Sequence, residues 1–455
     1  MMTNILATNI PDFPFPYFEV QFNKQGTAAD DNEINNALSL IAKGEFSDLF
    51  VVSHGWNNDM ADARNLYKNL FNSVKQVLDA GNVPKLGERK FAVLGILWPS
   101  KKFAEDELIP SGAAGINSAV TVTFIQNQLD NLKGVFDKPD ADATLEKAKL
   151  LVPKLESGSN AQREFADLIR SLPQRGAEHV DDATDRFFNL DGADVMKRLS
   201  KPAFAPPSSA KSVSAAASMG SPAGALHGAT GGAAGLGSFF SGIKSAARNL
   251  LNFTTYYQMK ERAGLVGQLG VNQLIRKIQA QSGGLKLHLI GHSFGGRLVT
   301  AAAFGSENQP AIKVNSMILL QAAFSHHGFA QKFDGSHDGF FRKVVAEKRV
   351  TGPIVITCTQ NDKAVGIAYP LASLISGQNA SALGDKNDPF GGIGRNGAQK
   401  TPEASDGTLL KIGGAYQFAL GKLHNLNADA IIKNHSDICH GEVAYAILNA
   451  VATRV

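Results

Sequence analysis

Short apolar runs rich in β-branched residues recur along the chain and alternate with helical patterns. Because these runs are apolar on both faces, they predict strands of a mostly parallel sheet with helices on both faces, an α/β fold. Residues 17–22 predict a further strand, which we expect to lie antiparallel at an edge of the sheet. The clearest runs are 48–54, 91–99, 286–291, 314–321 and 353–360.

A long segment between Trp98 and Leu285 interrupts this alternation. Its helical patterns lie near 119–137, 141–156, 160–172 and 238–253. Residues 202–237 are rich in Ser, Ala, Gly and Pro, a composition typical of a flexible tract. We therefore predict one α/β core interrupted by a large helical insertion. Its parts are 1–100 (N-terminal part of the core), 101–255 (insertion) and 256–455 (C-terminal part of the core).

Composition excludes several classes of protein. The net charge of +4 over 455 residues is too small to favour nucleic-acid binding. The two cysteines, Cys358 and Cys439, exclude a disulfide framework as the main source of stability. The first residues lack a basic segment followed by an apolar block, and no apolar stretch is long enough to span a membrane. We therefore expect a cytoplasmic protein, with signal-independent export left open.

The segment Gly291-His292-Ser293-Phe294-Gly295-Gly296 joins an apolar strand pattern to a small-residue helix pattern. A strand that reverses sharply into a helix needs residues without bulk on both sides of the bend. A serine held at such a bend presents its hydroxyl away from the core, where it can act as a nucleophile. The alternative is an ordinary Gly-Ser turn before a helix.

A serine nucleophile needs a histidine base and an acid that orients it. Asp362 follows the predicted strand 353–360, and His435 follows a plausible last strand within 421–429. Both therefore lie just beyond strand ends, in the chain order Ser, Asp, His. Asp334 and Asp338 are rival acids and His440 is a rival base, and we prefer Asp362 and His435 for their positions.

Four motifs together resemble the α/β-hydrolase superfamily of serine hydrolases, especially its lipase-like and esterase-like members. They are HGW at 54–56, GHSFGG at 291–296, QND at 360–362 and HSD at 435–437. The resemblance implies Ser293, His435 and Asp362 as a catalytic triad. It also implies that the backbone amides of Trp56 and Phe294 bind the oxyanion. This chemistry needs no metal and no organic cofactor.

Residues next to these motifs are candidates for contact with the substrate. We expect His54, Gly55, His292 and Phe324 to border it, although both histidines also suit a structural role. Residues 392–397 spell G-x-G-x-x-G, but no buried strand precedes them, so a phosphate cradle is disfavoured. We predict a surface loop there.

The expected function is hydrolysis of carboxylic esters through an acyl-enzyme. By resemblance, the insertion would form a lid over the nucleophile. The amphipathic pattern 238–253 has basic flanks, so it would either pack within the lid or contact an anionic membrane surface. The membrane alternative favours a lipid substrate and a phospholipase-type enzyme or secreted effector. A non-catalytic binding protein with the same fold is the remaining alternative.

Overall fold

A computed structural model provides the structure of the protein. It describes residues 10–56, 58–100, 118–174, 181, 184–201, 242–306, 309–362, 365, 375 and 388–453. The predicted tract 202–237 lies outside these described residues.

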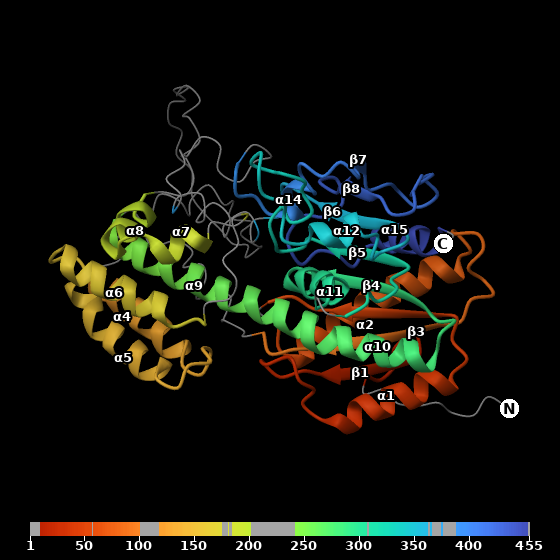
Figure 1. Cartoon of the computed structure of the whole chain (residues 1–455), viewed down its shortest axis with the longest axis horizontal. Coiled ribbons are helices and arrows are strands. Elements are labelled where there is room, and N and C mark those ends of the chain that lie inside the picture. Colours follow the sequence, from red (N-terminus) through yellow and green to blue (C-terminus); the bar gives the residue numbers. More distant parts are fainter. Residues whose placement is uncertain are drawn as a thin grey trace, which may run out of the picture.

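One sheet of eight parallel strands forms one side of the described structure, and a helical body lies on the other side (Figure 1). The strand order is β1-β3-β2-β4-β5-β6-β8-β7. Every residue of β2, β3, β5 and β6 is buried, as expected for strands covered on both faces. The strands are β1 (Tyr17–Gln21), β2 (Asp48–Ser53), β3 (Phe91–Leu97), β4 (Lys286–His292), β5 (Ser316–Leu320), β6 (Ile354–Cys358), β7 (Ala404–Thr408) and β8 (Leu423–Asn427).

The two edge strands differ from what the sequence indicates. β1 lies at an edge, but it runs parallel to β3, with Tyr17 opposite Val93, so the predicted antiparallel pairing is wrong. The reason is the helix α1 (Asp31–Lys43), which returns the chain to the end of the sheet where β1 begins. The next strands therefore run in the same direction as β1. At the other edge, β7 has the sequence ASDGT and is mostly exposed, so no apolar pattern marks it.

Helices cover both faces of the sheet (Figure 1). Apolar side chains of α2 and α15 pack on one face, and those of α1, α10 and α11 pack on the other. The described structure therefore has the layers of an α/β-hydrolase fold. The bounds are α2 (Met60–Asp79), α10 (Asn272–Gln281), α11 (Phe294–Phe304), α12 (Arg342–Ala346), α14 (Ile393–Asn396) and α15 (Gly441–Ala452).

Between β3 and β4 the chain forms a helical body beside the sheet (Figure 1). Three of its helices match the helical patterns in the sequence, and the two short ones, α7 and α8, were not predicted. The helices are α4 (Ser118–Asn131), α5 (Ala141–Leu151) followed by a 3-10 turn (Val152–Lys154), α6 (Ser159–Ser171), α7 (Thr184–Asn189) and α8 (Gly192–Leu199).

One continuous helical segment connects this body to the sheet. α9 (Ile243–Leu265) runs through a π-helical turn (Val266–Val271) directly into α10. A β-carbon at Gly267 would collide with the carbonyl oxygen of Leu298, so glycine allows the segment to lie close against α11. The predicted boundary after residue 255 falls within α9, and the division of the chain into these parts stays a prediction.

The apolar face of α9 is covered by the other insertion helices. Ala247, Leu250 and Leu251 are buried in the same apolar cluster as residues of α4, α6 and α8. Lys244 forms an ion pair with Glu156 at 3.2 Å. Residues 243–253 thus pack as part of the insertion, and the predicted contact of 238–253 with a membrane surface stays a prediction. In the parts of the chain that the structure describes, no helix is long and apolar enough to cross a lipid bilayer.

Candidate active site

Ser293 occupies a tight turn between β4 and α11. Its backbone has φ 56° and ψ −125°, a conformation that is costly for a residue with a side chain. A β-carbon at Gly291 would collide with the carbonyl of Gly295, and one at Gly295 would collide with the carbonyl of Ser53. The glycines on both sides of the serine are therefore what allows the turn to form.

Backbone hydrogen bonds hold this turn against the neighbouring strand β5. The Ser293 amide donates to the Leu320 carbonyl at 3.1 Å, and the Ala323 amide donates to the Ser293 carbonyl at 3.0 Å. Because β5 is a central, buried strand, these two bonds fix the position of Ser293 at the end of β4. Ser293 is buried, at 4% exposed.

Asp362 and His435, which both lie beyond the carboxyl ends of strands, are joined by a short hydrogen bond. Asp362 follows β6, and its Oδ2 lies 2.7 Å from Nδ1 of His435, which lies between β8 and α15. The other carboxylate oxygen accepts the Val365 amide at 2.9 Å, and the Asp362 side chain is fully buried. The acid is thus held rigidly, and the second ring nitrogen of His435 remains for other chemistry.

The predicted triad residues all follow the carboxyl ends of strands. Parallel strands present these ends at one edge of the sheet, where α/β proteins bind their ligands. Among the described atoms, no hydrogen bond links Ser293 Oγ to His435 Nε2. In unliganded sites, such a contact is often long and tightens when the substrate binds.

His292 packs directly against the predicted base. Its Nε2 lies 2.9 Å from the His435 carbonyl, and the two rings are 4.9 Å apart. Since a carbonyl only accepts, Nε2 of His292 carries the proton. Burial, together with the nearby His435, lowers the pKa of His292 to about 3, so the ring is neutral at pH 7. His292 therefore holds the backbone of the His435 loop, and its predicted contact with substrate remains a prediction.

Gly55 lies immediately beside the serine hydroxyl. A β-carbon at this position would come within 2.9 Å of Ser293 Oγ and would collide with the Ser293 β-carbon. The missing side chain lets the loop after β2 approach the serine, as the resemblance implies for an oxyanion loop. Trp56, the predicted first donor, follows directly in the chain.

Phe294, the predicted second donor, is the first residue of α11. The first amides of a helix have no acceptor within the helix and carry partial positive charge. The amide of Phe294 is therefore suited to bind a developing negative charge beside Ser293.

His54 supports this loop from within the core. Its Nδ1 lies 2.9 Å from the Gly55 carbonyl, and its Nε2 accepts the Trp98 amide at 3.3 Å. Burial lowers the pKa of His54 to about 4, which keeps the ring neutral at pH 7. Both ring nitrogens contact backbone groups, so His54 shapes the loop, and the predicted substrate contact has no support from these bonds.

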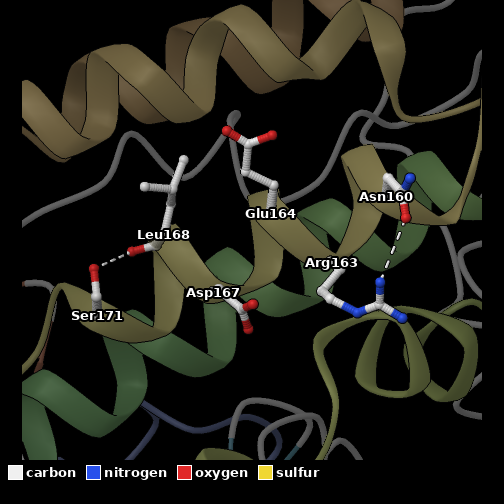
Figure 2. Close-up of a pocket in the computed structure, with 6 residues that line it drawn as sticks. All are labelled: Asn160, Arg163, Glu164, Asp167, Leu168 and Ser171. Atoms are coloured by element: carbon white, nitrogen blue, oxygen red, sulfur yellow. Dashed lines mark hydrogen bonds between the residues drawn. The ribbon is translucent and has the colours of Figure 1, made fainter.

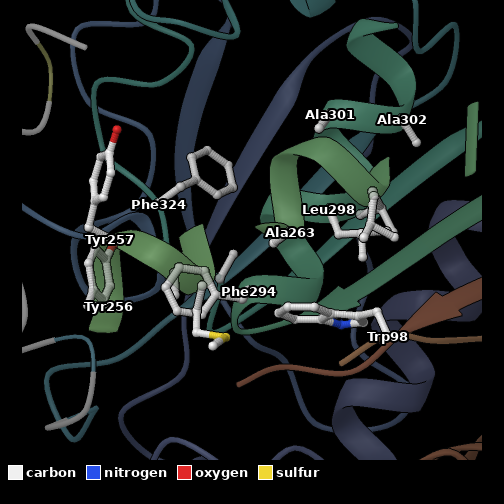
Figure 3. Close-up of a cluster of buried hydrophobic side chains, with 14 of the residues drawn as sticks. Trp98, Tyr256, Tyr257, Ala263, Phe294, Leu298, Ala301, Ala302 and Phe324 are labelled. Carbon is white, nitrogen blue, oxygen red and sulfur yellow. The ribbon is translucent and has the colours of Figure 1, made fainter. Parts of the chain in front are cut away.

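Phe324 belongs to a cluster of buried hydrophobic side chains (Figure 3). It is 2% exposed and packs edge-on against Phe329 and Phe341, with ring centroids 5.6 and 5.4 Å away. In this structure it is a core residue, and a contact with substrate remains a prediction.

The rival acids and base have other partners. His440 Nε2 pairs with Asp437 at 2.8 Å, and Asp334 pairs with His337 at 2.6 Å. Asp338 accepts the amide of Lys332 at 2.8 Å. None of these groups makes a hydrogen bond to Asp362 or His435 in the described residues.

Sequence reasoning missed the residues that anchor the loop before Asp362. Asn361 Nδ2 donates to the carbonyls of Asp429 and Ile432, at 3.0 and 2.8 Å. The Asp429 carboxylate accepts the Thr359 hydroxyl at 2.7 Å and the Gln360 amide at 2.8 Å. Asp429 comes just after β8, so its place beyond a strand end was the available signal.

A hollow of about 520 Å³ lies elsewhere, along α6 (Figure 2). Its lining comes from a single insertion helix and from no strand end, so it is not part of the candidate active site. The lining residues are Asn160, Arg163, Glu164, Asp167, Leu168 and Ser171.

Comparison with known proteins agrees with this fold. Residues 269–384 match the model of a family described as "Serine aminopeptidase, S33". This segment contains Ser293 and Asp362 and ends before His435. No curated protein and no solved structure gives a match to the chain. The family match and the parallel sheet together show that the chain has the α/β-hydrolase fold and is similar to hydrolases of that superfamily.

Proposed function

We propose that the protein is a serine hydrolase that cleaves carboxylic esters through an acyl-enzyme. The observation that carries this proposal is the 2.7 Å bond between Asp362 and His435, at the sheet edge where Ser293 occupies its strained turn. In the proposed reaction, Ser293 Oγ attacks the ester carbonyl carbon while His435 Nε2 accepts the hydroxyl proton. His435 then gives this proton to the leaving alcohol.

The second half of the reaction releases the acid. Water attacks the acyl-enzyme, His435 takes its proton, and the proton returns to Ser293 as the acyl group leaves as a carboxylic acid. Asp362 keeps His435 in the tautomer with a proton on Nδ1 and stabilises its charged form. In both halves, the amides of Trp56 and Phe294 would donate to the oxyanion.

Aromatic side chains next to the serine support a substrate with an apolar acyl group. The Phe294 ring lies 6.1 Å from the ring of Trp56 and 5.0 Å from the ring of Tyr256, which comes from α9 (Figure 3). The insertion thus reaches the residue after the nucleophile. This contact supports a role for the insertion in covering the site.

A second candidate is cleavage of an amide at the amino terminus of a peptide. The family description favours it, because that family is named for aminopeptidases. The same triad serves both reactions, but an alcohol leaves more readily than an amine. The buried apolar face of residues 243–253 gives no support to the membrane-active alternative.

The test is hydrolysis of p-nitrophenyl esters from short to long acyl chains, beside aminoacyl p-nitroanilides. We expect ester cleavage by the wild type and a loss of about 10⁶-fold in kcat in Ser293→Ala, because the nucleophile is removed. Faster cleavage of the anilides would favour the peptidase. Equal ester rates in wild type and Ser293→Ala would contradict the proposal, and so would a wild type that cleaves none of these substrates.

A further inference from the structure

The glycine-rich segment 392–397 is not the surface loop that its sequence predicts. Ile393 and Asn396 are at most 1% exposed, and Gly394 is also buried. The segment forms the short helix α14 across the carboxyl ends of β5 and β6 (Figure 1). Glycines have no side chain to reveal burial in an apolar pattern, which explains the wrong prediction.

Gly394 connects the two strand ends. Its amide donates to the Ala322 carbonyl at 2.9 Å, and its carbonyl accepts the Thr359 amide at 3.0 Å. A β-carbon at Gly394 would collide with the backbone between Gln321 and Ala322. Only glycine can therefore fill this position without moving β5.

The residues that Gly394 contacts are in turn hydrogen-bonded towards Ser293 on one side and towards Asp362 on the other. Ala323, next to Ala322, donates its amide to the Ser293 carbonyl at 3.0 Å. On the other side, the Thr359 carbonyl accepts the Asp362 amide at 3.2 Å. One short segment thus connects the turn that holds the serine with the turn that holds the acid.

Arg395 adds a direct contact to the acid loop. Its Nη1 donates to the carbonyl of Gln360 at 2.7 Å and to the carbonyl of Asp362 itself at 3.2 Å. The Gln360 side chain donates in return to the Arg395 carbonyl at 3.3 Å. A single guanidinium therefore holds two carbonyls of the loop that ends in the acid.

We propose that Arg395 is a positioning residue, which fixes the backbone of Asp362 so that its carboxylate meets Nδ1 of His435. This inference rests on the proposed function. A displacement of about 1 Å would lengthen the 2.7 Å contact beyond hydrogen-bond range, and errors of this size at a catalytic group cost about 100-fold in rate. Arg395 acts through Asp362 and needs no contact with substrate.

The test compares Arg395→Ala and Arg395→Lys with a matched control, Arg276→Ala. Arg276 is also partly buried and also donates to a backbone carbonyl, that of Pro310, but from α10 at the other side of the core. Steady-state hydrolysis of p-nitrophenyl butyrate gives kcat and KM separately. Proton NMR of the folded proteins gives the downfield signal of the His435 Nδ1 proton shared with Asp362.

We expect Arg395→Ala to lower kcat 10- to 100-fold with little change in KM, because substrate binding does not use this residue. The downfield proton signal should weaken in the same variant. Arg395→Lys should recover part of kcat, since its shorter cation restores part of the contact. Arg276→Ala should match the wild type in kcat and in the proton signal.

Wild-type kcat in both Arg395 variants would overturn the inference, as would an equal loss in Arg276→Ala or a change confined to KM. If Arg395→Ala does not fold, unchanged kcat in Arg395→Lys overturns it. Failure of the proposed function has a different signature, because the wild type would then show no turnover that depends on Ser293.

Discussion

Ser, His and Asp side chains occur at both ends of the strands of the sheet. At the carboxyl ends of the strands are Ser293, His435 and Asp362. At the amino ends, His288 Nδ1 lies 2.8 Å from Ser316 Oγ, and its Nε2 lies 2.8 Å from Asp48 Oδ1. In this second group, which we call the amino-end network, hydrogen bonds link Ser to His and His to Asp, as in a catalytic triad. In the first group, only the bond between His435 and Asp362 is present among the described residues.

The difference lies in the backbone that carries each serine. Ser316 is the first residue of the regular strand β5 and is fully buried, with no sharp turn and no helix beginning after it. Ser293 occupies a strained turn at the start of α11, with Gly55 beside its hydroxyl. The two serines thus differ in backbone conformation and in the helix amides and loop beside them, and the residue types alone do not define a catalytic site.

The largest expected difference comes from the two aspartates. Asp362→Asn should lower kcat about 10⁴-fold, because the amide no longer holds His435 in the required tautomer. Asp48→Asn should leave kcat unchanged per folded molecule, since its partners Ser47, Arg89 and His288 lie at the amino ends of the strands, away from Ser293. Ester kinetics at matched folded fractions, checked by circular dichroism, test the pair. Equal losses would mean that the two ends of the sheet are functionally coupled.

A smaller effect is expected from glycines near and far from the serine. Gly55→Ala should lower kcat about 10²- to 10³-fold, because its β-carbon pushes the oxyanion loop away from Ser293. The control is Gly87→Ala, where a β-carbon meets no atom within 4 Å. Wild-type kcat in Gly55→Ala would show that this loop does not contribute an oxyanion donor.

The smallest effect concerns stability rather than rate. Burial alone would raise the pKa of Asp48, but hydrogen bonds from His288, Arg89 and Ser47 lower it to about 2. Because this pKa lies below the unfolded value of about 3.9, the aspartate stabilises the fold above pH 4 and loses this contribution as the pH falls towards 2. Asp48→Asn removes the contribution.

Urea unfolding between pH 5 and pH 2 measures this effect. The free energy of unfolding of the wild type should fall more steeply over this range than that of Asp48→Asn. Burial also lowers the pKa of His288, so its protonation in the unfolded chain adds to the loss in both proteins below about pH 6.5. Parallel curves would show that Asp48 adds no pH-dependent stability.

Much of the core was predictable because its strands are continuous apolar runs. β2 to β6 fall where the pattern indicates, and Asp362 and His435 could be proposed from their positions after strands. β7 could not be predicted, because an exposed edge strand needs no apolar residues. The predicted antiparallel direction of β1 was wrong, because the apolar pattern of a strand does not encode its direction.

The contacts that support the candidate site could not be predicted from the sequence. Arg395 acts on backbone carbonyls, and a carbonyl is present in every residue, so no motif marks the pair. The basic residues near 244–248 suggested a membrane surface, but Lys244 pairs with Glu156, which lies in the turn before α6 and is distant in the sequence. Such partners become visible only when the fold brings them together.

The most direct test of Ser293 as the nucleophile is to label the protein with a fluorophosphonate probe and to locate the labelled serine by mass spectrometry. We predict one label per chain on Ser293, none on Ser316, and loss of labelling in Ser293→Ala and in His435→Ala. A label on another serine, or undiminished labelling of Ser293→Ala, would contradict the assignment of Ser293 as the nucleophile.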